Sequence, residues 1–301
     1  MISVIMLTYN REALVGRAIE SILAQSLRNF EFIIIDNGST DNSGKIADEY
    51  AVRDNRIRVF HKARGNIGFG RNVGLSAARG DYIAFIDDDD WVEPDYLEFL
   101  YQLLVEYGAD ASICGTTAAF SEKRCVMSAE EAVIETMWRK LFKVGFPGKL
   151  FRGSIIGNLR FPEDTIHDDC FLMHKVLSNA ERIAYDGTLK YHIFHGASST
   201  TTWKDDFRLL TPELLNDLLH SRKLRTEWCS ARFPSSAPLF RYFEWSFMIS
   251  MVEKINRFHI TPCHRILDAM VQELSVHKNE FLGCGYCQPS ERLWVEQYVT
   301  D

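Results

Sequence analysis

The feature that most constrains the fold is a regular alternation of short apolar runs with longer amphipathic stretches over the first 115 residues. The apolar runs have strand length and lie at 3–7, 30–35, 56–60, 81–86 and 109–114. Helical spacing of apolar residues follows them at 11–25, up to about residue 52, at 71–78 and after Pro94. Such alternation is typical of a mostly parallel sheet covered on both faces by helices. We therefore predict an α/β fold for this half.

Three of these runs are followed directly by polar clusters. The clusters are Thr8-Tyr9-Asn10, Asp36-Asn37 and Asp87–Asp90. Ligands of open α/β sheets bind beyond the carboxyl ends of the strands, so the three clusters predict one shared site. We also expect Asn10 to cap the first helix and the glycines at 65, 68 and 70 to form a loop before a helix that begins at Arg71.

The run of four aspartates has two interpretations. At an effective dielectric near 20, two carboxylates ~6 Å apart repel by roughly 3 kcal/mol, so the cluster must be solvated or neutralised. It is either a solvated loop or a divalent-cation site, since hard cations choose oxygen ligands. Its place beside two other polar strand ends favours the cation site.

Composition excludes several classes of protein. The net charge of −7 argues against a nucleic-acid binder. No apolar stretch is long enough for a transmembrane segment, and no signal peptide is visible. Seven scattered cysteines fit reduced thiols in a cytoplasm better than a disulfide framework.

The second half is organised differently. A capping box at Ser128–Glu131 predicts a helix to about Leu141, and helical patterns dominate from about Asp205, at 206–222, 237–257 and 262–278. The stretch 240–252, FRYFEWSFMISMV, is either a packed helix or a face for peripheral association with a membrane or partner.

Several motifs in fixed order resemble the family-2 glycosyltransferases of the GT-A fold. They are SVIMLTYNREALVGRAIESILAQSLRNFEFIIIDNGSTDNS (3–43), GRNVGLSAARGDYIAFIDDDDW (70–91), the KLFRGSI, RFPE and HDD elements of 149–169, and LKYHIFHGASST (189–200). The resemblance covers about residues 1–205. It implies a GT-A type, Rossmann-like sheet flanked by helices, with a helical C-terminal region.

The resemblance also implies an activity. It is inverting transfer of a hexosyl group from a nucleotide diphosphate sugar to a glycan or lipid-linked acceptor. A UDP-sugar is the donor we expect first, and Mn²⁺ or Mg²⁺ the cofactor. Residues 1–115 would bind the nucleotide sugar, 116–205 the acceptor, and 206–301 form a helical region. Surface polysaccharide assembly, in the cytoplasm or at the inner face of the membrane, is the implied setting.

Roles for single residues follow from the matched motifs. Asp169 stands as the catalytic base, with Asp168 where the family usually has Glu, although both are also candidate N-caps of a helix. Asp89, with Asp87, would bind the metal. The implied nucleotide-binding residues are Thr8, Tyr9, Asn10, Arg11, Asp36, Asn37, Gly68, Arg71, Asp87 and Asp88. Asn37 departs from the family's usual aspartate, and its amide carries no charge toward the base.

Two alternatives stay open at this point. A sugar-phosphate nucleotidyltransferase would need a glycine-rich, basic loop after the first strand, and TYNREA is neither. A non-catalytic nucleotide- or glycan-binding relative would fit the Asn37 and HDD departures.

Overall fold

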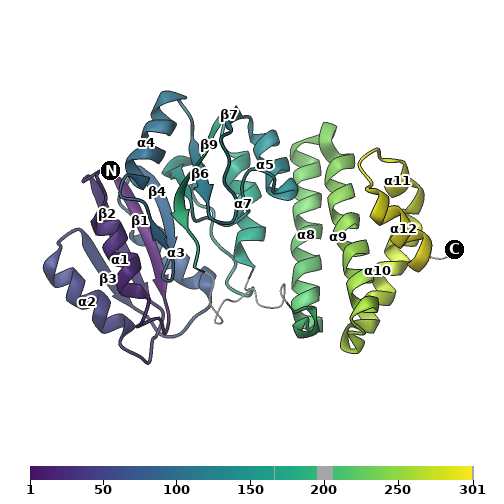
Figure 1. The fold of residues 1–301 in the computed structure, drawn as a ribbon, viewed down its shortest axis with the longest axis horizontal. Coiled ribbons are helices and arrows are strands. Elements are labelled where there is room, and N and C mark those ends of the chain that lie inside the picture. The colour runs from purple at the N-terminus through teal and green to yellow at the C-terminus, as the bar shows by residue number, and fades with distance from the viewer. Residues whose placement is uncertain (166, 195–205, 300–301) are drawn as a thin grey trace. The chain divides into compact units, whose positions relative to one another are not determined.

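The computed structural model describes residues 1–165, 167–194 and 206–299, and the chain divides into two compact units, 1–194 and 195–301. The first unit is a nine-stranded mixed sheet with helices packed on it, and the described part of the second unit is helical (Figure 1). The predicted α/β fold with a mostly parallel central sheet and a helical C-terminal region is confirmed.

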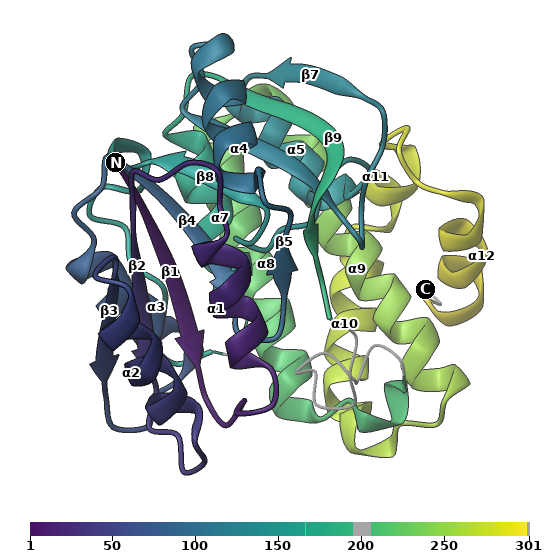
Figure 2. The same cartoon turned by 60° about the vertical axis from the view of Figure 1, so that its left-hand side comes forward.

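The parallel core of the sheet runs in the order β3-β2-β1-β4. Next to it, β8 pairs antiparallel with both β4 and β6, and β9 then pairs with β6, β5 and β7 (Figure 2). The strands are β1 (Ile2–Thr8), β2 (Phe30–Asp36), β3 (Ile57–His61), β4 (Tyr82–Asp87), β5 (Trp91–Val92), β6 (Ala111–Thr116), β7 (Arg124–Met127), β8 (Lys149–Arg152) and β9 (Ile183–His192).

Alternating side chains of β1 pack against helices on the two faces of the sheet. Val4 and Met6 share one core with residues of α1 (Val15–Leu23), α2 (Ser43–Arg53) and α4 (Tyr96–Glu106). Ile5 and Leu7 meet α3 (Ile67–Ala77) on the other face. The two layers hold the strand ends, where the polar clusters lie, between rigid helices.

Two predicted helix starts are wrong. The first helix begins at Val15 rather than Arg11, because Asn10 takes a left-handed φ of 52° and its side-chain oxygen accepts a hydrogen bond from the Thr40 backbone N–H at 2.8 Å. The third begins at Ile67 rather than Arg71, because the Asn66 side chain caps it by accepting from the Phe69 N–H at 2.8 Å.

Three helices follow β6 in the first unit. They are α5 (Ala129–Trp138), α6 (Gly153–Ile156) and α7 (Asp168–Ser178). The predicted capping box is present at α5, where the Ser128 side chain accepts from the Glu131 backbone and the Glu131 carboxylate accepts from the Ser128 N–H. Neither Asp168 nor Asp169 is the N-cap of α7. That position belongs to His167, which makes no side-chain cap.

The second unit contains five α-helices among its described residues, namely α8 (Pro212–Arg232), α9 (Ala237–Arg257), α10 (His264–Val276), α11 (Lys278–Gly283) and α12 (Pro289–Tyr298). Residues 237–257 form a helix with the predicted bounds, whereas α8 starts six residues later than expected because Thr211 caps it and Pro212 opens it. Phe240, Trp245 and Ile249 of α9 are buried, as a packed helix requires. Within 1–165, 167–194 and 206–299, no helix is long and apolar enough to cross a membrane.

Candidate active site

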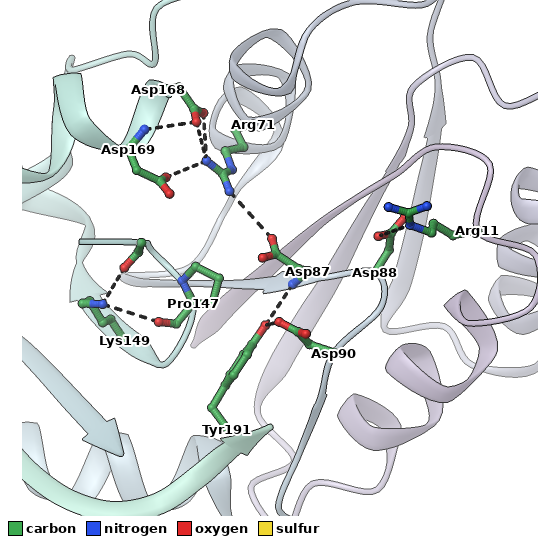
Figure 3. Close-up of polar contacts among 11 residues, drawn as sticks. Arg11, Arg71, Asp87, Asp88, Asp90, Pro147, Lys149, Asp168, Asp169 and Tyr191 are labelled. Carbon is green, nitrogen blue, oxygen red and sulfur yellow. Dashed lines mark hydrogen bonds and ion pairs between the residues drawn. The ribbon is translucent and has the colours of Figure 1, made fainter. Parts of the chain in front are cut away.

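The polar strand ends meet at one edge of the sheet, as predicted. Thr8 ends β1 and pairs in register with Asp36 at the end of β2, while Leu7 pairs with Asp87 at the end of β4. Asp87, Asp88 and Asp90 lie along the turn that follows β4 (Figure 3). The three clusters therefore belong to a single site.

Arg71 of α3 ties this edge to the start of α7. Its guanidinium donates to both oxygens of Asp168, at 2.9 and 2.8 Å, and to Asp169 at 2.7 Å (Figure 3). Its other terminal nitrogen lies 3.7 Å from Asp87. Arg71 is only 8% exposed, and its three carboxylate neighbours raise the pKa of the guanidinium further above its ordinary value. The sequence suggested that Arg71 either contacts phosphate or stabilises its loop, and in the structure it joins carboxylates of β4 and α7.

The carboxylates of this site are electrostatically crowded. Burial raises the pKa of Asp168 to about 6, against the lowering effect of Arg71. Loss of hydration raises the pKa of Asp87 to about 7, with Arg71 opposing and Asp90 adding to the shift. The pKa of Asp88 is raised to about 7, again mainly by burial. Burial thus raises the pKa of all three carboxyl groups, and a bound cation would favour their ionised forms.

The four aspartates have different partners. Asp90 is buried and accepts from the Tyr191 hydroxyl at 2.6 Å and the Phe194 N–H at 2.8 Å, so it anchors the turn to the end of β9 rather than capping a turn of its own. Asp88 accepts from the Tyr9 N–H at 3.2 Å and lies 3.7 Å from Arg11. These two are committed to the protein.

Asp87 and Asp89 face outward by comparison. Half of the Asp87 side chain is exposed. Across the described parts of the chain, the Asp89 carboxylate has no hydrogen bond or ion pair, although its backbone carbonyl accepts from Arg17, which lies 4.1 Å from the Trp91 ring centroid. Arg17 therefore holds the backbone of the turn while the carboxylate stays available.

No group of three or more His, Cys, Asp or Glu side chains is placed to bind a metal ion in the described residues. This does not conflict with a Mg²⁺-type cation, which one or two carboxylates bind together with substrate phosphates. Asp87 and Asp89 fit that pattern, because they are the two carboxylates of the turn that the protein leaves accessible.

The part of the site expected to hold the nucleobase of the donor lies at the ends of β1 and β2. Asn37 donates to the Gly65 carbonyl at 2.8 Å and accepts from the Gly65 N–H at 3.0 Å, so its amide fastens a neighbouring loop. Arg64 of that loop lies 3.1 Å from the centroid of the Tyr9 ring. Arg64 was not predicted as part of this site, because nothing in a lone exposed arginine signals that it will stack on a tyrosine 55 positions away.

Asp36 is also held by the protein. It accepts from the Ser39 N–H at 3.0 Å and lies 2.9 Å from Nδ1 of His61. Hydrogen bonds with Asp36 and Asp48 raise the pKa of His61. His61 was not foreseen as part of this site. The signal that could have found it is its position as the last residue of the strand beside β2.

Gly68 occupies a position that only glycine fits. A Cβ there would lie 2.0 Å from the Pro162 carbonyl oxygen, which is backbone and cannot move aside cheaply. We expect Gly68→Ala to destabilise the protein by about 1–3 kcal/mol through overpacking. Thermal unfolding checks this, with Gly283→Ala as a control because a Cβ there would meet nothing within 4 Å. Equal stability of Gly68→Ala and wild type would contradict the packing argument.

A sequence model described as glycosyl transferase family 2 matches residues 3–178. The glycosyltransferase GlyA of Streptococcus pneumoniae is 32% identical over 202 residues, which are 61% of this chain and 29% of GlyA. EpsH of Bacillus subtilis is 36% identical over 208 residues, 64% of this chain and 60% of EpsH. This chain thus matches less than two thirds of the length of either relative.

Solved structures share the fold. S. aureus TarS 1-349 in complex with UDP-GlcNAc has a TM-score of 0.61 at 19% identity, covering 99% of this chain and 91% of that chain. The mannosyltransferase PcManGT from Pyrobaculum calidifontis, in complex with GDP-Man and Mn²⁺, has a TM-score of 0.55 at 14% identity, covering 99% and 86%. Since the family match spans more than half of the chain and the fold is that of GT-A enzymes, the chain belongs to glycosyltransferase family 2.

Proposed function

We propose that the chain catalyses inverting transfer of a hexosyl group from a UDP-sugar to a glycan or lipid-linked acceptor, assisted by Mn²⁺ or Mg²⁺, in surface polysaccharide assembly. The observation that carries the proposal is the pairing around Arg71. One guanidinium lies 2.7 Å from Asp169, our candidate base, and 3.7 Å from Asp87, our candidate metal ligand. Donor and acceptor groups of a single reaction need this closeness.

Asp169 has the properties of a general base for the acceptor. Its side chain is 26% exposed, whereas that of Asp168 is 4% exposed. The Oδ1 of Asp169 accepts a hydrogen bond from Arg71 at 2.7 Å, and a carboxylate within reach of the acceptor hydroxyl can take its proton. The acceptor hydroxyl would lose its proton to Asp169 and bond to the anomeric carbon. The bond from that carbon to the diphosphate would break on the opposite side, so the configuration inverts.

The leaving diphosphate explains the aspartate turn. Asp87 and Asp89 are the residues that would hold Mn²⁺ or Mg²⁺. When bound, such an ion offsets the negative charge of a departing diphosphate. Asp88 and Asp90 would keep the turn in place through Tyr9, Arg11 and Tyr191.

The relatives support the donor class. TarS has been solved with UDP and with UDP-GlcNAc, and PcManGT with GDP-Man and Mn²⁺. Within this chain, we assign the donor to residues 1–115, where Thr8, Tyr9, Asp36 and the aspartate turn lie, and the acceptor to residues 116–205, which supply Asp169. Residues 206–301 receive no role in the chemistry.

A thermal-shift panel of UDP, dTDP, GDP and CDP, with and without Mn²⁺, tests the donor and metal assignments. A nucleotide at a hundredfold excess over Kd stabilises the folded state by about 2.7 kcal/mol. We expect UDP to raise the melting temperature only with Mn²⁺, and Asp89→Ala to remove that shift while Asp164→Ala, at an exposed carboxylate outside the turn, keeps it. A shift of equal size without metal, or in Asp89→Ala, would refute the metal assignment.

A further inference from the structure

Lys149, the first residue of β8, is a buried charge that the proposed reaction does not use. Lys149 is 3% exposed. Within the described residues, its ammonium group forms no hydrogen bond or ion pair with a carboxylate. Instead it donates to three backbone carbonyls, those of Lys143 at 3.0 Å, Gly145, and Pro147 at 3.5 Å. The contact with Pro147 is drawn in Figure 3. A buried ammonium group is costly unless all its hydrogens are satisfied.

The three carbonyls come from alternate residues of one short segment, 143–147. An ammonium group has three hydrogens, so each can serve one carbonyl. The segment thus curves around Nζ as a backbone curves around a bound cation. Phe146, between the acceptor residues, is fully buried against Phe85 at 5.3 Å and Phe161 at 4.7 Å between ring centroids. Its ring fixes the segment to the core from the other side.

This segment lies beside Asp169. A Cβ built on Gly145 would be 3.5 Å from Oδ2 of Asp169, so the Gly145 backbone is a wall next to that carboxylate. The opposite oxygen, Oδ1, accepts from Arg71. The Asp169 carboxylate is therefore bounded by Arg71 on one side and by the segment on the other.

We propose that Lys149 is a positioning residue, which wraps residues 143–148 around its ammonium group and so fixes the wall that orients the acceptor at Asp169. The inference rests on the proposed role of Asp169 as base. It assigns an acceptor-side specificity role to a segment that no motif of the sequence marks. It also explains why the position carries a lysine rather than an apolar residue in a buried strand.

The charged groups around Lys149 set its pH response. Burial lowers the pKa of Lys149 to about 8, and Asp169 on α7 and Cys114 on β6 oppose that shift. The Cys114 thiol stays protonated, because burial raises its pKa to about 12. A neutral amine has two hydrogens for three carbonyls, so one contact and the charge are lost as pH rises through about 8. The segment then loosens.

The contribution of Lys149 to the free energy of unfolding should instead increase as pH rises. The folded pKa of Lys149 lies below the unfolded value of about 10.4, so between about pH 8 and 10.4 the unfolded chain binds more protons and this residue makes unfolding harder as pH rises. We therefore expect kcat/KM for the acceptor to fall above pH 8 without a matching fall in melting temperature. That result would distinguish loosening of the segment from general unfolding.

The experiment compares Lys149→Met and Lys149→Arg with Lys123→Met, which removes an exposed lysine outside the segment. For Lys149→Met we expect kcat/KM for the acceptor to fall about 10- to 100-fold, as for a misplaced reactant, with the Kd for UDP within twofold of wild type. The amide hydrogens of residues 143–146 and 148 should exchange faster by a similar factor. Lys123→Met should match wild type in all three measurements.

The arginine variant keeps the experiment decisive should Lys149→Met fail to fold. Arginine stays charged, so the loss of acceptor kcat/KM that wild type shows above about pH 8 should disappear in Lys149→Arg. Unchanged amide protection and acceptor kinetics in Lys149→Met, or an equal alkaline loss in Lys149→Arg, would overturn the inference. Failure of the proposed function is a separate result, since it would appear as retained transfer in Asp169→Asn.

Discussion

Asp169→Asn is expected to reduce sugar transfer by about 10²- to 10⁴-fold, the contribution of a positioned general base. The amide has nearly the shape of the carboxylate and can still accept a hydrogen bond from Arg71, which lies 2.7 Å from Asp169. What it loses is the ability to take the acceptor's proton. Nucleotide binding should persist, because Asp169 belongs to α7 rather than to the strand ends. Initial rates of transfer and the thermal shift with UDP and Mn²⁺ measure the two effects.

The control for this variant is Asp164→Asn, an exposed carboxylate five residues before it. It should transfer at the wild-type rate. Wild-type turnover in Asp169→Asn would remove Asp169 as the base. Absence of turnover in the wild type, with nucleotide binding intact, would instead favour the non-catalytic relative that the Asn37 and HDD departures left open.

Arg71→Met is expected to be the most destabilising single change in the site. It would leave the Asp168 carboxylate, 2% exposed, without the Arg71 Nη1 from which both of its oxygens accept, at 2.9 and 2.8 Å. Removing one partner of a buried ion pair typically costs 3–5 kcal/mol. Thermal or urea unfolding would detect the change, with Arg79→Met, an exposed arginine just past α3, as the control.

The pH dependence of that variant has a definite sign. The pKa of Asp168 is already raised to about 6 in the folded protein, against about 3.9 when unfolded, and loss of Arg71 raises it further. Between the unfolded and the folded pKa of Asp168, the folded state binds more protons, so the free energy of unfolding increases as pH falls. The gap between Arg71→Met and wild type should therefore shrink from pH 7 to pH 5, and Asp168→Asn in the same chain should also narrow it. A gap independent of pH would contradict a charge-based cause.

The sequence was most informative where the pattern is local. Apolar runs of strand length located β1, β2, β3, β4 and β6, and the polar residues after three of them lie at one edge because parallel strands align their ends. The family assignment also held, and it favours a glycosyltransferase over the nucleotidyltransferase alternative. Helix starts were less predictable. Asn10, which we expected to cap the first helix, instead accepts a hydrogen bond from the Thr40 N–H, and Asn66, which we expected in a loop, caps the third helix.

Long-range pairings could not be predicted from the chain alone. Arg71 and Asp168 are 97 positions apart, and nothing in either motif says that one guanidinium will hold both aspartates. The same holds for Asn37, whose amide bonds to the Gly65 backbone, and for Lys149, whose acceptors are carbonyls that every residue carries. Contacts to backbone leave no signature in residue types.

The last six residues of the 189–200 motif, His195 included, lie outside the described residues.

Tyr191 has a consequence for the order in which the enzyme is made. Its hydroxyl donates to Asp90 at 2.6 Å and accepts from the Asp87 N–H at 3.1 Å, across about a hundred positions. During synthesis at about 5–20 residues per second, the aspartates leave the ribosome roughly 5–20 seconds before this tyrosine. The parallel strands can pair in that interval, but the turn gains its anchor only once β9 joins the sheet. The turn to which we assign donor binding is thus completed late on the nascent chain.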